Sequence, residues 1–128
     1  MRDQGDGHAR VVDVGSGKCL DVNGGSSATA DGTRVVQWTC HGGTNQQWRF
    51  EDARGGHVRL VARHSGKCPD VLRASTTDGA QLVQWTCGGG TDQQWLRRDA
   101  WVALRSWRGR ASAAGVSAGV RWWVAGSP

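Results

Sequence analysis

The chain has 128 residues, with one Met, one Phe and no Tyr, so Val, Leu and eight Trp must supply most of the core of one small domain. Its formal net charge of +5 arises entirely after Leu96, because residues 1–96 carry ten basic and ten acidic side chains, whereas residues 97–128 carry six Arg and one Asp. The neutral balance of the longer part argues against binding to nucleic acid. No run of 18 or more apolar residues is present, so we expect no membrane span and no membrane partner.

Short runs rich in Val and Trp alternate along the chain with Gly, Ser, Asn and Asp, which is typical of β-strands joined by turns. In chain order, the first such runs cover residues 10–14, 20–22, 34–38 and 47–50. No window before Ala100 carries a 3.6-residue apolar stripe. The sequence therefore predicts an all-β domain with about four short strands in each of the repeats described next.

Two stretches of the chain carry nearly the same sequence. SGKCLDV at 16–22 returns as SGKCPDV at 65–71, and VQWTC at 36–40 returns at 83–87. TNQQW at 44–48 likewise returns as TDQQW at 91–95. Self-similarity at this period marks a repeat architecture. We expect residues 1–7 to be disordered and a domain to cover 8–106, with a first repeat at 8–50, a second at 51–98 and the start of a third at 99–106.

The pattern stops after Ser106. Residues 107–128 hold no cysteine and no Gln-Gln-Trp, and we treat them as an atypical basic tail without strand or turn pattern. Two hypotheses account for this tail. It is either an out-of-frame or degenerate replacement of a third repeat, or a basic, Trp-rich anchor for a membrane or an anionic glycan. Gly109, Gly115 and Gly119 disfavour the amphipathic helix that an anchor would use.

The four cysteines lie two in each repeat. Pairing within the repeats joins Cys19 to Cys40 and Cys68 to Cys87, whereas the other two connectivities cross the boundary between repeats. A zinc site is the alternative, but such sites favour closely spaced Cys-x-x-Cys pairs, which are absent. We therefore expect two disulfides, no metal or other cofactor, and an oxidising compartment.

The order G-K-C-L-D-V, V-Q-W-T-C and N-Q-Q-W, present nearly twice between Val11 and Trp95, resembles the ricin B-type lectin family, also grouped as family 13 carbohydrate-binding modules. The resemblance implies a β-trefoil of three four-stranded lobes, here incomplete because the third lobe is atypical. It also implies one shallow site per lobe for galactose-type or xylose-type sugars. Members commonly belong to secreted glycoside hydrolases or toxins.

A sugar site needs hydrogen-bond acceptors, an amide that both donates and accepts, and a flat ring that stacks on the C–H face of the sugar. In the first repeat Asp21, Asn45 and Trp38 offer these groups, and the family pattern adds His41. Gln46 is expected to brace Asp21 or the turn from behind. The corresponding candidates in the second repeat are Asp70, Trp85, Asp92 and Gln93.

Each candidate has a structural alternative. Asp21 can cap a turn, Trp38 can be buried, and His41 can be a solvated loop residue. Trp48 and Trp95 are assigned to the core, because they follow the Gln-x step within strand-like runs.

The second site departs further from the family pattern than the first. Val36 and Val83 both stand where relatives often carry a polar residue, so each site loses one contact. In the second repeat Pro69 removes a backbone N–H, Gly88 replaces a histidine, and Asp92 replaces an amide with a carboxylate. We therefore expect the first site to be the better one.

These features predict a non-catalytic, extracellular carbohydrate-binding module. Residues 1–7 lack the apolar stretch of a secretory signal, which indicates a piece of a larger secreted protein such as a glycoside hydrolase. An enzyme is disfavoured because glycoside hydrolysis needs two facing carboxylates, whereas Glu51 and Asp52 are adjacent and point apart in a strand. The alternative is a trefoil scaffold or protein-interaction fragment that binds no sugar.

Overall fold

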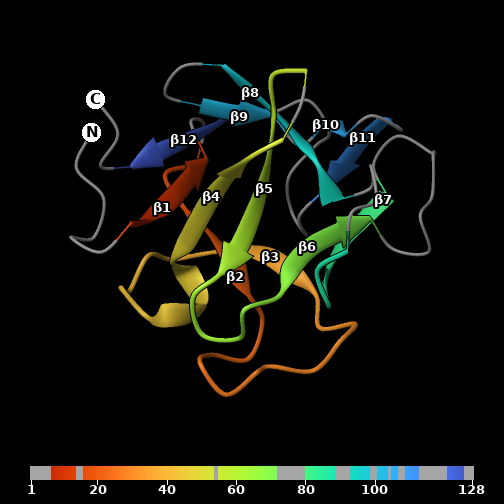
Figure 1. Ribbon diagram of the computed structural model, residues 1–128. Helices are drawn as coiled ribbons and strands as arrows, with labels where there is room; N and C mark the ends of the chain where they lie inside the picture. Colours follow the sequence, from red (N-terminus) through yellow and green to blue (C-terminus); the bar gives the residue numbers. More distant parts are fainter. Residues whose placement is uncertain are drawn as a thin grey trace.

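The structure is a computed structural model that describes residues 7–13, 16–53, 55–71, 80–88, 93–98, 101–103, 105–106, 109–112 and 121–125 (Figure 1). Its strands fall into three groups of four. The first group is β1 (His8–Asp13), β2 (Cys19–Val22), β3 (Val35–Trp38) and β4 (Trp48–Asp52). The second is β5 (His57–Ala62), β6 (Cys68–Val71), β7 (Ala80–Trp85) and β8 (Trp95–Arg98). The third is β9 (Trp101–Ala103), β10 (Arg105–Ser106), β11 (Gly109–Ser112) and β12 (Arg121–Ala125).

The first and last strands of each group form a closed ring. Neighbours follow the order β12-β9-β8-β5-β4-β1, and β12 pairs again with β1, beside which it lies in Figure 1. The middle strands of each group pair as the hairpins β2–β3, β6–β7 and β10–β11. A ring of six strands with three hairpins is the architecture of a β-trefoil, which confirms the all-β trefoil expected from the sequence.

The last strand corrects two expectations. We expected an incomplete trefoil and a tail without strand pattern after Ser106, yet β11 and β12 lie in that tail and β12 closes the ring. Arg121–Ala125 combines Trp and Val in a strand-length run, which suits a paired β-strand even without the Gln-x-Trp motif.

The register of β12 matches that of β4. Trp48 lies opposite Ala9 on one side and Ala62 on the other. Trp122 lies opposite Val102 and Asp13 in the corresponding way. The backbone of the third group therefore repeats the arrangement of the first, although the sequence motif is absent there.

The boundaries assigned from the sequence at residues 7 and 106 stay predictions. The disorder expected for the N-terminal segment falls on residues 1–6, outside the described part, apart from Gly7, which is described.

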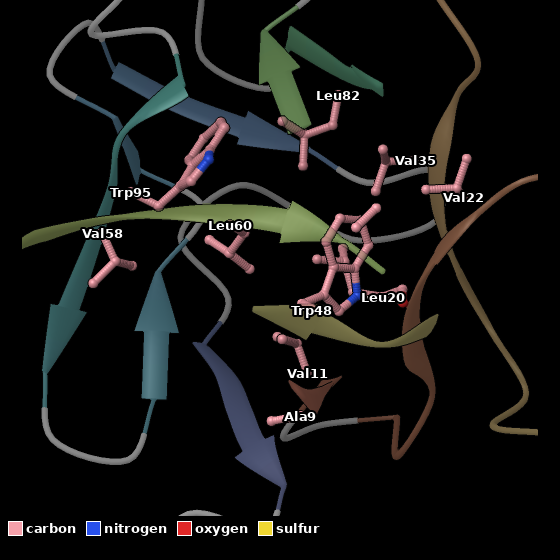
Figure 2. Packing of buried hydrophobic residues seen from close by; sticks show 11 residues of the cluster. Ala9, Val11, Leu20, Val22, Val35, Trp48, Val58, Leu60, Leu82 and Trp95 are labelled. Carbon is pink, nitrogen blue, oxygen red and sulfur yellow. Dashed lines mark hydrogen bonds between the residues drawn. The ribbon is translucent and has the colours of Figure 1, made fainter. Parts of the chain in front are cut away.

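The core lies inside the ring and under the hairpins. The indoles of Trp48 and Trp95 are each 1% exposed, as the sequence predicted, and Figure 2 shows them among aliphatic side chains. The Trp48 indole N–H donates a 3.1 Å hydrogen bond to the carbonyl of Leu20, so its polar atom is satisfied. The other buried members of this cluster are Ala9, Val11, Leu20, Val22, Val35, Val58, Leu60, Ala62 and Leu82.

Two disulfides fasten the open ends of the first two hairpins. Cys19 is bonded to Cys40 and Cys68 to Cys87, with Cα atoms 5.1 Å apart in both pairs. This is the pairing within repeats that the sequence predicted. The described part of the chain contains no free cysteine.

Candidate functional site

The hairpin β2–β3 presents two different faces. Leu20, Val22 and Val35 belong to the hydrophobic core. Asp21 lies opposite Val36 in the register, and side chains alternate between the faces of a strand, so Asp21 lies on the outer face. Trp38 is two residues beyond Val36 and shares that face. The outer face of the hairpin therefore carries a carboxylate with an indole diagonally across from it.

The two indoles on the outer faces are exposed. Trp38 is 58% exposed and Trp85 is 47% exposed, which excludes the alternative that they are buried. The second hairpin has the same register, because Cys68 lies opposite Trp85 and Asp70 opposite Val83. Both repeats thus combine a buried carboxylate with an exposed aromatic ring, since Asp21 is 4% exposed and Asp70 is 9% exposed. A diagonal neighbour across two strands lies about 7–8 Å away, within reach of one sugar ring.

The Asp21 carboxylate is held by two amides from the 3-10 helix η1 (Thr44–Gln46). Gln46 Nε2 donates to Asp21 Oδ2 at 2.7 Å, and Asn45 Nδ2 donates to the same oxygen at 3.3 Å. Asn45 also donates to the carbonyl of Val22 at 3.0 Å. Because both donors are buried and end on Oδ2, the orientation of the carboxylate is set by the protein.

Gln46 is fully occupied as a brace. Besides Asp21, its Nε2 donates to the carbonyl of Thr39 at 3.0 Å, while its Oε1 accepts the amide N–H of His41 at 2.9 Å. Its side chain is 0% exposed. In this conformation Gln46 positions the carboxylate and the turn that follows Cys40, as the sequence analysis expected of a bracing residue.

The same brace occurs in the second repeat. Gln93 Nε2 donates to Asp70 Oδ2 at 2.7 Å and to the carbonyl of Thr86 at 3.1 Å. Its Oε1 accepts the amide N–H of Gly88 at 2.8 Å. The duplication of all three bonds shows that the two hairpins are built on one plan, so the differences between the sites lie in the residues around this brace.

His41 distinguishes the first site from the second. The amide N–H of Gly43 donates to His41 Nδ1 at 3.0 Å, so Nδ1 is the acceptor and Nε2 carries a proton. Nε2 lies 3.5 Å from Asp21 Oδ2, and the His41 side chain is 45% exposed. His41 therefore adds an accessible donor beside the carboxylate, whereas Gly88 offers no side chain at that place.

Burial raises the pKa of the Asp21 carboxyl above its ordinary value of 3.8. The hydrogen bond from Gln46, the neighbouring His41 imidazole and the hydrogen bond from Asn45 lower it, but they do not cancel the effect of burial.

The structure brings together most of the predicted site residues. Asp21, Asn45, Gln46 and His41 form one network, with Trp38 on the same face of the hairpin. In the second repeat Asp70, Gln93 and Trp85 repeat that arrangement, while Asp92 lies outside the described residues.

One neighbour of the second site was not predicted. Asp31, in the β2–β3 loop of the first repeat, accepts a 2.8 Å hydrogen bond from the amide of Thr86, directly after Trp85. The Asp-Gly pair at 31–32 signals a turn in the sequence, but nothing in it indicates that the loop reaches the other repeat.

Glu51 and Asp52 belong to neither hydrogen-bond network, although the pocket that they line reaches Gly88 of the second one. They line a half-open pocket of about 220 Å³ together with Ala53, Arg59, Gly88 and Gln94. The Glu51 carboxylate is bound by Arg59 and, at 2.7 Å, by Arg49. These two bonds lower the pKa of Glu51, so this carboxylate stays charged and serves an ion-pair network.

Among the described residues, no cluster of three or more His, Cys, Asp or Glu side chains could hold a metal ion. In the same part of the chain no helix is long and apolar enough to cross a membrane.

Comparison with known families agrees with the repeated sequence pattern and the trefoil ring. The ricin-type beta-trefoil lectin domain-like family matches residues 1–85 and, in a second overlapping match, residues 44–115. The chain belongs to this family. Membership in a ricin-type lectin family supports a carbohydrate-binding role for the chain.

Solved structures extend the comparison of this ricin-type domain. It is 40% identical to ThreeFoil, a designed three-fold symmetric protein, over 93% of this chain and 89% of that one, with a TM-score of 0.75. It is 28% identical to 1,3Gal43A, an exo-beta-1,3-galactanase from Clostridium thermocellum, over 95% of this chain but 28% of that one, with a TM-score of 0.70.

A third similar structure supports the fold alone. The C-half of the earthworm R-type lectin, solved in complex with GalNAc, is 16% identical over 94% of this chain and 89% of that one, with a TM-score of 0.57.

Proposed function

We propose that the protein is a non-catalytic carbohydrate-binding module whose first site consists of Asp21, Trp38, His41 and Asn45, with Gln46 behind them. The observation that carries this proposal is the pairing, on one outer face, of a braced carboxylate and a 58% exposed indole. The same pairing recurs at Asp70 and Trp85, Gln93 acting as brace there.

The chemistry of the first site suits a sugar. A charged acceptor makes stronger hydrogen bonds to hydroxyl groups than a neutral one, and Asp21 is held in place before the ligand arrives. The indole of Trp38 offers a rigid face to the C–H side of a sugar ring. His41 Nε2–H supplies a donor next to the acceptor. One site of this size binds weakly, about 4 kcal/mol or millimolar, so two sites on one polysaccharide would gain by avidity.

The two sites differ in strength. The second site lacks the donor of His41, because Gly88 stands there, and Pro69 replaces Leu20 beside the carboxylate. In the first repeat the carbonyl of Leu20 accepts the indole N–H of Trp48, whereas Trp95 Nε1 has no hydrogen-bond partner in the described part of the chain. These differences support a stronger first site.

The relatives and the disulfides support a proposal for the wider setting of the module. The two disulfides are consistent with an extracellular protein. The match to the exo-beta-1,3-galactanase 1,3Gal43A covers only 28% of the length of that enzyme, so the trefoil is one part of a larger chain there. We infer the same arrangement here: the module attaches a secreted enzyme or toxin to xylan-like or galactose-containing glycans.

The test is a glycan-binding screen followed by titration of the chain and of the Trp38→Ala and Trp85→Ala variants with lactose and xylotriose. We expect binding by the unaltered chain, a large loss in Trp38→Ala and a smaller loss in Trp85→Ala. Equal affinity in all three proteins would exclude stacking on these rings. Absence of binding to every glycan would favour the alternative of a scaffold or protein-interaction fragment.

A further inference from the structure

The loop between β2 and β3 of the first repeat lies against the hairpin β6–β7 of the second. The amide N–H of Gly32 donates to the carbonyl of Gln84 at 2.7 Å, and the amide N–H of Gln84 donates to the carbonyl of Thr33 at 2.6 Å. Arg34 then forms an antiparallel bridge with Val83. Residues 32–34 therefore extend β3 along the edge of β7 that faces away from β6, next to the part of that edge where β11 pairs with Ala80 and Gln81.

A bulge at Gly32 brings this segment beside Trp85. Gly32 and Thr33 both face the single residue Gln84, with Gly32 at φ +90, which is the geometry of a bulge that requires glycine at its first position. A Cβ built on Gly32 would lie 4.0 Å from Cζ3 of Trp85. The backbone of the first repeat thus forms one wall of the second indole.

Asp31, directly before the bulge, fastens the wall to both strands of the second hairpin. Its Oδ1 accepts the amide of Thr86 at 2.8 Å and the Thr86 hydroxyl at 3.1 Å. The same oxygen lies 3.2 Å from the ammonium of Lys67. Thr86 follows Trp85, and Lys67 precedes Cys68, which lies opposite Trp85. The contacts of Asp31 with Thr86 and Lys67 therefore span the end of the hairpin that carries the Trp85 indole.

Backbone carbonyls of the loop add further anchors. Lys67 Nζ donates to the carbonyl of Thr29 at 2.6 Å. Gln84 Nε2 donates to the carbonyls of Ala28 and Ala30 at 3.1 and 2.9 Å. Residues 28–33 are thus tied at several points to the second repeat, which fixes their position relative to Trp85.

We propose that the second sugar site is assembled from two repeats: residues 28–33 of the first repeat form its outer wall, and Asp31 is a positioning residue that keeps the Trp85 indole in place. This inference rests on the proposed carbohydrate-binding function. It adds that the second site binds sugar although it lacks the histidine of the first, because the wall from the neighbouring repeat preorganises its aromatic ring.

The experiment measures the second site alone, in the Trp38→Ala background, by titration with lactose and xylotriose. Asp31→Ala is expected to weaken binding about tenfold, the effect of losing charged hydrogen bonds that orient the ring. Asp31→Asn keeps an oxygen for the Thr86 amide and should restore part of the affinity, which a merely destabilising change would not predict. Ser26→Ala, an exposed residue of the same loop, is the matched control and should leave the affinity unchanged.

Lys67→Met is the second variant, in case Asp31→Ala does not fold as judged by circular dichroism. It removes the contacts to Asp31 and Thr29 and should also weaken the second site. If the unaltered chain binds but Trp38→Ala does not, the inference fails while the proposed function stands. Equal affinity of Trp38→Ala with and without the Asp31 and Lys67 changes overturns it as well. If the unaltered chain binds no sugar, both fail together.

Discussion

Gln46 donates a 2.7 Å hydrogen bond to Asp21 across 25 residues of sequence, and both side chains are buried. This bond joins the hairpin that carries the indole to the turn after the disulfide. Its counterpart between Gln93 and Asp70 has the same length. The Gln-x-Trp motif therefore has two parts with different duties: the glutamine positions a carboxylate, and the tryptophan fills the core.

Gln46→Leu removes the brace while it keeps the volume of the side chain. We expect the free energy of unfolding to fall by about 2–3 kcal/mol, because Asp21 and the His41 amide lose their buried partner. Sugar affinity at the first site should fall with it. Thermal denaturation and titration of the same variant measure both effects. Gln93→Leu is the matched change in the second repeat, and first-site affinity that survives Gln46→Leu unchanged would contradict the bracing role.

Sugar affinity at the first site should depend on pH through Asp21. Burial raises the pKa of this carboxyl above 3.8, so as the pH falls the acceptor becomes protonated earlier than an ordinary aspartic acid. At pH values between the unfolded pKa of Asp21 and its raised pKa in the folded protein, the folded state binds more protons than the unfolded state. The free energy of unfolding therefore rises through this group as the pH falls, whereas sugar affinity decreases because the acceptor is lost. Titrations from about pH 7 to about pH 4 check this. A flat profile in that range would contradict it.

Asp21→Asn is the control for the pH experiment. This variant should bind sugar weakly at every pH, and the part of the pH dependence of affinity and stability that comes from the Asp21 carboxyl should disappear. Glu51 acts in the opposite direction, because hydrogen bonds from Arg59 and Arg49 lower its pKa below 4.5, so the stability that it provides is lost as the pH falls through that depressed value. Circular dichroism at each pH therefore separates loss of binding from loss of structure.

The exposed and buried tryptophans should respond differently to truncation. Trp48→Ala removes a 1% exposed indole and its hydrogen bond to Leu20, and should cost about 3–5 kcal/mol of unfolding free energy. Trp38→Ala should cost less than about 1 kcal/mol, because its ring is mostly in solvent. Chemical denaturation compares them. A similar loss in both variants would show that Trp38 packs in the core in solution.

Each disulfide should contribute a similar amount to stability. The bridges close segments of 21 and 19 residues, for which loop-closure entropy corresponds to about 3 kcal/mol each. Replacement of Cys19 and Cys40 by Ser should therefore lower stability as much as replacement of Cys68 and Cys87. Denaturation of the two double variants tests this, and a large difference between them would show that one loop retains its structure without its bridge.

Closure of the ring by β12 predicts a cost for proline in that strand. Trp123 lies opposite Val12 of β1 on one side and Trp101 of β9 on the other. Its amide N–H therefore points at a paired strand, whichever of the two sides it is on. Trp123→Pro should lower the free energy of unfolding by about 1–3 kcal/mol or more, since a ladder hydrogen bond is lost. Trp123→Val keeps the amide and is the control. Equal stability of the two variants would argue against a paired β12.

Several features could be predicted from the sequence because they depend on short motifs. The cysteine pairing follows from the position of two cysteines in each repeat. The burial of Trp48 and Trp95 follows from the Gln-x step before them, and the exposure of Trp38 from its place two residues before a cysteine. The closing strand could not be predicted in this way. Its place depends on backbone register with β1 and β9, and a strand of Arg, Trp, Val and Ala meets that requirement without a motif.

The contact between the β2–β3 loop and the second hairpin was also beyond the sequence pattern. Most of the loop groups that make this contact belong to the backbone, which every residue type possesses: the carbonyls of Ala28, Thr29, Ala30 and Thr33 and the amide of Gly32. The Asp31 side chain reaches Thr86 and Lys67, but an aspartate before glycine is an ordinary turn signal. The contact of this loop with the second hairpin therefore depends on how the fold places the two repeats, and no residue pattern in the loop predicts it.

Pairing of the first strand with the last has a consequence for how the molecule is made. While a ribosome is still synthesising the final segment, β1 has no β12 to pair with, and one edge of the nascent sheet stays open to other chains. Because that contact spans almost the whole chain, its formation is slow compared with contacts between neighbours in sequence. We therefore expect freshly synthesised protein to pass through an aggregation-prone stage that ends only when the last strand docks.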